Sequence, residues 1–499
     1  MYTRKSKQTR FLLLGLALIL LGGLSSACTK SNDPGDTEKH VLRIGVLYGG
    51  SDNEPYFRQQ YTDMFEMQNS NIEFEIVGAI NYDDQRFNQP TDGETVEQPD
   101  PYEEMSKMMN GQNPVDVVVL DYNMLQRMTR DNLLQNLDPL IERDKFDISD
   151  YVPTVIDGIK AAGDNNLYAL TPTFTSSALY YNRKLFQEAG VEPPTDKMSW
   201  TDILNKARQM TKGEGADRIF GFSFNRWMSD GFSDVENYSQ TLQLKTIDDE
   251  GKKMLVNNDQ WADAWDTVAG LYQDKIVPDR DFMNTMNEAN ASSGKADPFY
   301  GDLFIHGNVA MVIGDSGYVS ELKKANDNAA SVDDFDGIDW DVVTVPTHPS
   351  TPDQGGNIYL SQLMGINVKA QNPEDAWKFI EFTNSKEWAK LKSRSNYELV
   401  ARKEYLKPVG GLDYNMDAFT TLRPILPSST TDSDIYQKNP NAWQARQIGY
   451  ELFNSVVDGS KETKDALAEW ETRGNAILEG QLENGDGGVG GGPIVRPMF

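Results

Sequence analysis

Hydrophobic residues in the first part of the chain follow two patterns that alternate along the sequence. Short apolar runs at residues 41–48 (VLRIGVLY), 72–79 (IEFEIVGA) and 115–120 (VDVVVL) predict β-strands, and the third run is apolar enough to be covered by helices on both faces. The segments between these runs repeat apolar residues every three or four positions, which is typical of amphipathic helices. A β-α-β-α-β order with short links predicts parallel strands joined by right-handed crossovers, and hence an α/β fold.

The same alternation continues through the rest of the chain. Residues 167–171 and 178–182 predict short strands on either side of Pro172. Ser199, followed three residues later by Asp202, forms the capping-box pattern that begins a helix. With 499 residues and no visible internal repeat, the chain is long enough for two large lobes or about three domains.

The first 27 residues have the composition of a secretory signal peptide. Four basic residues lie within positions 1–10, and the apolar run at 11–24 is shorter than the roughly 20 residues of a membrane span. Cys28 follows Ser25, Ser26 and Ala27 directly. This segment resembles the lipobox of bacterial lipoproteins, although that motif usually has Leu three places before the cysteine, where this chain has Ser25. The resemblance implies lipidation of Cys28, whereas ordinary cleavage near Ala27 would leave it a free thiol.

The residues after the cysteine predict a flexible tether. Positions 28–40 are mostly polar and include Pro34 and Gly35. We therefore expect the mature protein to be a monomer at the extracytoplasmic face of the bacterial cell membrane, held there by its N-terminal lipid.

The composition narrows the possible functions. Counts of 47 basic and 76 acidic residues give a formal net charge of −29, which repels phosphate backbones, so nucleic acid is not an expected partner. One cysteine excludes an internal disulfide and a cysteine-based zinc site, and His40, His306 and His348 lack metal-ligand spacing. The chain has no HExxH, GxSxG or P-loop motif. We therefore expect no metal, no cofactor and no Ser–His or Cys–His catalysis, which favours a binding function.

Several longer segments carry a family resemblance. They lie at 115–141 (VDVVVLDYNMLQRMTRDNLLQNLDPLI), 168–190 (YALTPTFTSSALYYNRKLFQEAG), 303–319 (LFIHGNVAMVIGDSGYV), 340–346 (WDVVTVP), 364–388 (MGINVKAQNPEDAWKFIEFTNSKEW) and 399–405 (LVARKEY). In this order, behind a lipoprotein-like signal, they resemble the bacterial extracellular solute-binding proteins of family 1, the sugar-binding receptor subunits of ABC importers. The resemblance covers most of residues 41–480.

The resemblance implies a two-lobed periplasmic-binding-protein fold of type II, with a hinge and a ligand cleft between the lobes. The first lobe would comprise residues 41–171 and 357–406, and the second 172–356 and 407–482, with a Gly-rich tail at 483–499. The chain would cross between the lobes three times. Closure around a ligand would be a hinge motion, and the closed form would dock on the permease subunits of the importer.

The chemistry of a sugar cleft suggests which residues bind. Sugar hydroxyls favour charged or amide partners, and the C–H faces of sugars favour aromatic rings. In α/β sheets such groups lie on loops beyond the carboxyl ends of the strands. Tyr48 and Asp52 follow the first predicted strand, and Asp121 and Tyr122 follow the third. Tyr48 could instead be a packing residue, and both aspartates could instead cap helices.

Further candidates come from the resemblance. They are Thr173 and Phe174 at the first crossing, Trp227 with the weaker candidates Arg226 and Asp230, then Asp315, Ser316 and Tyr318 after the apolar strand 310–313, and Asn357 and Tyr359 at the second crossing. Tyr318 stands where the family commonly has Trp. Thr173 and Phe174 could be purely structural hinge residues, and Trp227 could belong to a core.

Two other functions remain open from the sequence. A lipid-anchored glycoside hydrolase needs two carboxylates about 5–9.5 Å apart, and the abundant acids do not exclude such a pair, although the eightfold pattern of a barrel is absent. A receptor for peptides or other small solutes would favour a paired Arg and carboxylate over several aromatic residues. Arg86, near Asp83 and Asp84 in the polar loop predicted at 81–98, could make such contacts or could simply be solvated.

Overall fold

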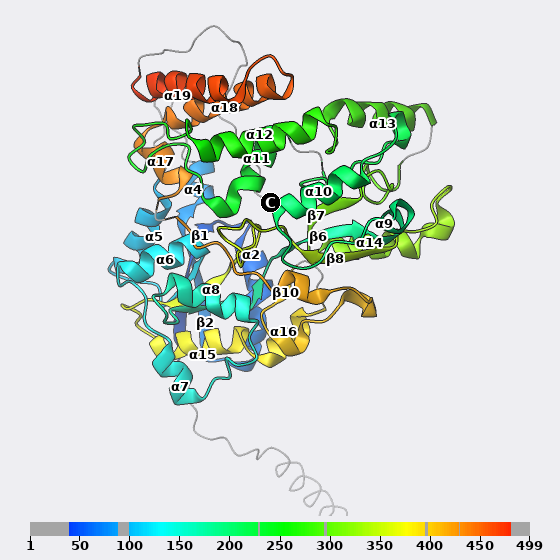
Figure 1. Ribbon diagram of the computed structural model, residues 1–499. Coiled ribbons are helices and arrows are strands. Elements are labelled where there is room, and N and C mark those ends of the chain that lie inside the picture. The colour runs from blue at the N-terminus through cyan, green and yellow to red at the C-terminus, as the bar shows by residue number, and fades with distance from the viewer. Residues whose placement is uncertain are drawn as a thin grey trace, which may run out of the picture.

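The computed structural model describes residues 39–87, 99–227, 230–293, 297–394, 398–428 and 430–480. The predicted signal peptide, Cys28, most of the tether and the Gly-rich tail lie outside these residues. The described chain forms two bodies, each built on its own β-sheet and covered by helices (Figure 1).

The first lobe has a five-stranded sheet in the order β2-β1-β3-β9-β4. Its strands are β1 (His40–Gly49), β2 (Ile72–Asn81), β3 (Val117–Leu120), β9 (Leu363–Ile366) and β4 (Ala169–Leu170). β1 pairs in parallel with β2 and β3, which confirms the three predicted strands and their direction. β9 pairs antiparallel with both β3 and β4, so a strand from much later in the chain completes this sheet.

Helices cover the first sheet and fill its connections. They are α2 (Glu54–Phe57), the π-helix η1 (Arg58–Thr62), α3 (Asp63–Gln68), α4 (Tyr82–Phe87), α5 (Pro101–Asn110), α6 (Tyr122–Arg130), α7 (Asp138–Asp144), α8 (Pro153–Ala162), α15 (Pro373–Thr383) and α16 (Lys386–Lys392). α4 corrects one prediction, because residues 82–87 form a short helix where the polar pattern predicted a loop.

The second lobe has a three-stranded antiparallel sheet in the order β7-β6-β8, from β7 (Met311–Asp315), β6 (Ser177–Asn182) and β8 (Trp340–Thr344). Alternate residues of β6 enter different cores: Leu179 packs on one face of the sheet and Tyr180 on the other. This two-sided burial explains why the four central residues of β6, Ala178–Tyr181, are all hydrophobic.

The helices of the second lobe include a large layer at the top of Figure 1. They are α9 (Arg183–Ala189), α10 (Trp200–Met210), α11 (Gly231–Ser239), α12 (Asp259–Gln273), α13 (Arg280–Ser293), α14 (Tyr318–Asp327), α17 (Asp432–Lys438), α18 (Ala442–Val457) and α19 (Thr463–Leu478). Ser199 caps α10 by accepting the Asp202 N–H at 3.1 Å, as the sequence predicts.

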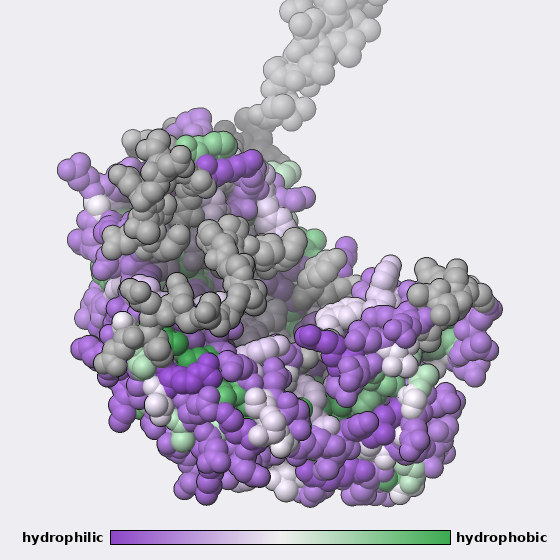
Figure 2. Space-filling view, turned by 90° about the horizontal axis from the view of Figure 1, so that it is seen from above, coloured by the Kyte–Doolittle hydropathy of each residue, from purple (hydrophilic) through white to green (hydrophobic). Residues whose placement is uncertain are grey.

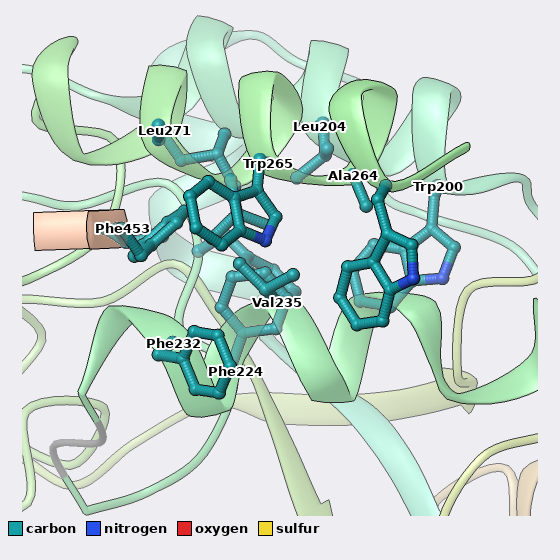
Figure 3. Packing of buried hydrophobic residues seen from close by; sticks show 14 of the residues in the cluster. Trp200, Leu204, Phe224, Phe232, Val235, Ala264, Trp265, Leu271 and Phe453 are labelled. Atoms are coloured by element: carbon teal, nitrogen blue, oxygen red, sulfur yellow. The ribbon is translucent and has the colours of Figure 1, made fainter. Parts of the chain in front are cut away.

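Aromatic side chains hold this layer together. Trp265 is fully buried, and its ring meets Phe453 edge-on at 5.2 Å and Phe232 at 6.4 Å between ring centres (Figure 3). The buried tryptophans at 200, 261, 265 and 470 therefore belong to the core of the second lobe.

The connections between the lobes lie side by side. The short strand β5 (Thr173–Phe174) pairs antiparallel with β10 (Leu399–Val400), and Thr175 forms a bridge with Tyr359. These contacts join the three segments that connect the lobes, and along each segment the chain passes from one core to the other. In the second of these segments, Ile358 packs in the core of the second lobe and Leu360 in that of the first. A hinge can form where such short paired segments link two independent cores.

Candidate functional site

The carboxyl ends of β1, β2 and β3 meet at one edge of the first sheet, called the sheet edge below. Tyr48 pairs in register with Ile80, and Val46 with Val119, so Tyr48 and Asp121 end neighbouring strands. The rings of Tyr48 and Tyr82 stack with their centres 5.3 Å apart and their planes 9° from parallel. Burial raises the pKa of Tyr48, and Tyr82 and Asp121 raise it further, so this phenol stays neutral.

The carboxylates of the sheet edge remain exposed. Asp52 lies 3.9 Å from Arg86 across the loop, and both side chains are largely in solvent. Asp121 caps α6 by accepting the Met124 N–H at 2.7 Å, as one interpretation of the sequence predicts. Asp121 is nevertheless exposed. Its other oxygen is therefore available to a ligand hydroxyl.

Tyr122 does not reach this surface. Its ring is buried, and its hydroxyl donates to the Gly158 carbonyl at 2.7 Å. The structure therefore gives Tyr122 a packing role between α6 and α8, and it leaves the candidate site.

The helical segment after the sheet edge connects it to the hinge. η1 is a π-helix, a rare conformation that often occurs at functional sites. Gln60, on η1, accepts a hydrogen bond from the Lys392 ammonium of α16, and the ring of Tyr61 stacks on Trp388 at 6.1 Å. Tyr56, one turn earlier, is 68% exposed.

The predicted residues of the crossings separate into buried and exposed groups. Phe174 is fully buried in the core of the first lobe, so it cannot form a cleft wall. Thr173 is also buried, but its hydroxyl donates to Glu398 at 2.7 Å. Tyr359 is 55% exposed, and its hydroxyl donates to Asn357 at 3.0 Å. Asn357 has a φ of 60°, a left-handed conformation that asparagine tolerates better than most residues.

A cavity of about 480 Å³ lies beside the crossings, called the interlobe cavity below. One wall comes from the first lobe, another from Ser316 at the end of β7, and the third from the last crossing. Its lining residues are Ser316, Lys390, Ser393, Arg394, Glu398–Val400, Tyr405–Gly410, Tyr414, Met416 and Phe419. Ser316 is the one predicted binding residue in this lining. Its neighbour Asp315 is exposed. Asp315 is the last residue of β7, whereas the sequence predicted that the strand ends before it.

The predicted aromatic pair of the second lobe has one exposed and one buried member. Trp227 is 52% exposed, with the Arg226 guanidinium 5.1 Å from its ring centre. Arg226 also lies 3.8 Å from the ring centre of Tyr318 and pairs with Asp302 at 3.2 Å. Tyr318 is fully buried and donates its hydroxyl to Asp302 at 2.8 Å, so it cannot stack on a ligand. Burial, followed by the charge of Asp302, holds the pKa of Tyr318 well above its usual value.

The network around Asp302 therefore supports Trp227 instead of binding ligand. Asp302 is 1% exposed, and it neutralises Arg226, which in turn lies against the Trp227 ring. Asp230 has a local structural role, because it caps α11 by accepting the Ser233 N–H at 2.8 Å. Trp227 remains as the exposed aromatic face of this group.

Sequence reasoning missed several residues of the site. Tyr82 lies three residues after the strand predicted at 72–79 and directly follows the observed β2, so the rule that selected residues beyond strand ends could have selected it as well. Glu398 gave no signal, because its partner Thr173 is more than 200 residues away. The cations of the interlobe cavity gave none either, because a charged segment is typical of an ordinary solvated surface. Across the part of the chain that the structure describes, no group of three or more His, Cys, Asp or Glu side chains could hold a metal ion.

Comparisons with known proteins agree with this architecture. The family model for "Bacterial extracellular solute-binding protein" matches residues 78–390. The sn-glycerol-3-phosphate-binding periplasmic protein UgpB of Rhizobium meliloti (strain 1021) is 21% identical over 351 residues, which cover 68% of this chain and 74% of that protein.

Two solved structures share the fold. A sugar transporter from Rhizobium etli in an open conformation matches with a TM-score of 0.55 and 17% identity over 88% of this chain and 99% of that one. The sugar-binding protein MalE from Xanthomonas citri matches with a TM-score of 0.55 and 17% identity over 89% of this chain and 98% of that one. These likenesses confirm the predicted two-lobed fold of type II. Figure 2 shows the corresponding shape, a mostly hydrophilic surface that is deeply hollowed on one side.

Proposed function

Since the chain belongs to the family of bacterial extracellular solute-binding proteins, we propose that it binds a carbohydrate, an oligosaccharide in particular, between its two lobes and delivers it to an ABC importer. We propose further that Cys28 is lipidated and holds the protein at the extracytoplasmic face of the membrane. Within the described ranges, no helix is both long and apolar enough to cross a membrane.

One observation carries the carbohydrate proposal. Partly buried aromatic rings occur together with exposed carboxylates at the sheet edge, and rings that are about half exposed lie at the second crossing and on the second lobe. The rings are Tyr48 with Tyr82, Tyr359, and Trp227, and the carboxylates are Asp52 and Asp121. Half-exposed aromatic faces suit the C–H faces of sugars, and carboxylates accept hydrogen bonds from sugar hydroxyls. Closure of the hinge would bring the two lobes around one ligand.

The test is ligand binding by the soluble chain, residues 29–499. Thermal unfolding would be measured with a panel of neutral and acidic oligosaccharides and with sn-glycerol-3-phosphate, the ligand in the name of the UgpB relative. A ligand at about 100 times its dissociation constant adds roughly 2.7 kcal/mol of stability, which corresponds to a rise in Tm of about 5–10 °C for a lobe of this size.

Each result separates the candidate functions. A rise in Tm with one class of oligosaccharide, recovered intact by chromatography, supports the receptor. Cleavage of the sugar during incubation would instead indicate a glycoside hydrolase. No rise with any sugar would reject the carbohydrate proposal and leave peptides or other small solutes.

A further inference from the structure

Three cations line the interlobe cavity, and none of them has an acidic partner among the residues that the structure describes. Lys390 lies in the last turn of α16, Arg394 lies two residues beyond the end of that helix, and Lys407 lies on the last crossing. From these cations we propose that the cavity binds a negatively charged group of the ligand, so that this receptor takes acidic carbohydrates such as uronate oligosaccharides. This inference rests on the proposed carbohydrate-binding function and names the substrate class.

The cations of this wall differ from a neighbouring lysine on the same helix. Lys386, four residues before Lys390 on the same helix, lies within 4 Å of the carboxylates of Asp147, Asp150 and Glu404, at 3.4, 3.9 and 3.4 Å. In contrast, Lys390, Arg394 and Lys407 have neither an ion pair nor a side-chain hydrogen bond to any residue that the structure describes. Acidic residues outnumber basic ones by 76 to 47 in the chain, so a shortage of acids does not explain this difference.

The one carboxylate in the lining is already engaged. Glu398 accepts a hydrogen bond from the hydroxyl of Thr173 at 2.7 Å. Lys392, nearby on α16, bonds to Gln60 and lies 5.3 Å from the ring centre of Trp388. Burial lowers the pKa of Lys392, and the charge of Glu398 opposes that effect. The cavity wall therefore carries three cations, Lys390, Arg394 and Lys407, and one carboxylate, Glu398.

The remainder of the lining suits a sugar better than a free inorganic anion. Tyr405 supplies a partly exposed aromatic ring, several aliphatic side chains lie beside it, and Ser316 and Ser393 add hydroxyls. The volume of about 480 Å³ falls in the range of about 300–1,000 Å³ that small-molecule sites occupy. A free phosphate would leave this apolar wall without contacts, whereas a sugar acid uses both the wall and the cations.

The net negative charge of the protein does not prevent such binding. At physiological ionic strength, charges are screened over about 8 Å, so a bound carboxylate responds mainly to the nearest cations. Arg394 can hold a carboxylate through two parallel hydrogen bonds, and a lysine adds a point charge.

The experiment uses calorimetry with matched pairs of sugars on the soluble chain, residues 29–499. The pairs are trigalacturonate and its methyl ester, and a mannuronate trimer and its methyl ester. We expect the acidic member of at least one pair to bind at least about tenfold more tightly than the neutral member. Raising the salt from about 0.05 M to about 0.5 M should weaken this binding.

Variants connect the preference to the cavity. The double substitution Lys390→Gln and Arg394→Gln should weaken binding of the acidic sugar by about tenfold or more, and by a larger factor than it weakens binding of the neutral partner. Lys184→Gln, an exposed lysine on α9 in the other lobe, is the matched control and should change neither.

The outcomes distinguish this inference from the proposed function. Tighter binding of the neutral member in every pair would overturn the acidic substrate and leave the carbohydrate receptor in place. Acidic binding that the double substitution does not weaken would overturn the role of the cavity. Binding of no sugar at all would overturn the carbohydrate receptor itself.

Discussion

Replacing Trp227 with alanine should weaken carbohydrate binding by about tenfold or more while the protein stays folded. Trp227 is 52% exposed, and its ring contacts the guanidinium of Arg226, 5.1 Å from the ring centre. Arg226 keeps its ion pair with Asp302 at 3.2 Å and its contact with Tyr318 when the indole is removed. The substitution therefore leaves no buried charge without a partner.

The substitution should lower both the stability of the protein and its affinity for the ligand, and the two losses can be measured separately. Truncating a fully buried tryptophan costs about 3–5 kcal/mol of stability. Because half of the Trp227 surface is already in water, and an exposed cation–π contact contributes about 0.5–1 kcal/mol, we expect a loss of about 1–2 kcal/mol. A tenfold loss of affinity corresponds to about 1.4 kcal/mol of binding free energy.

Calorimetry with the sugar identified in the panel would measure the affinity, and urea unfolding would measure the stability. Tyr300→Ala is the control, because Tyr300 is an aromatic residue of the same lobe that is 84% exposed and lies outside the proposed site. An unchanged dissociation constant for a folded Trp227→Ala variant would refute the reasoning and remove Trp227 from the binding site.

Three other substitutions test the site and its support. Tyr48→Ala should weaken sugar binding several-fold by removing one ring of the stacked pair at the sheet edge, and calorimetry that finds no change would reject this contact. Asp302→Asn should lower the free energy of unfolding by about 3–5 kcal/mol, because it leaves the Arg226 charge buried without its partner; a loss below about 1 kcal/mol in urea would contradict that assignment. Burial alone would raise the pKa of Asp434, but hydrogen bonds from Thr431 and the charge of Arg127 outweigh it and hold the pKa below its usual value. The stability from Asp434 is therefore present above the pKa of an unfolded aspartate and lost as the pH falls through the folded pKa, so Asp434→Asn should flatten the acid limb of stability against pH, and an unchanged limb would count against this sign.

Patterns within short segments determined the elements of the fold. The apolar runs that predicted β1, β2 and β3 depend on residues close in sequence, and so do the caps at Ser199 and Asp121. The family match agrees with the resemblance drawn from segments spread over the whole chain. These features were accessible because a strand or a cap needs only a few neighbouring residues to be recognised.

Contacts between distant segments were not accessible in the same way. β9 enters the first sheet between β3 and β4 from about 200 residues later, and no local pattern in residues 363–366 says which strand it will join. The contact of Thr173 with Glu398 spans a similar separation. Such pairings depend on how the whole chain packs.

The sequence by itself determined the composition of the site: aromatic rings and carboxylates at the ends of parallel strands, and the family to which they belong. Only the tertiary structure decided which of these residues face a ligand. Tyr122, Phe174 and Tyr318 carry the same side chains as good sugar-binding residues, yet all three are buried, whereas Trp227 and Tyr359 are about half exposed. The physical reason is that burial depends on the residues packed around a side chain, and in this protein those residues come from other parts of the chain.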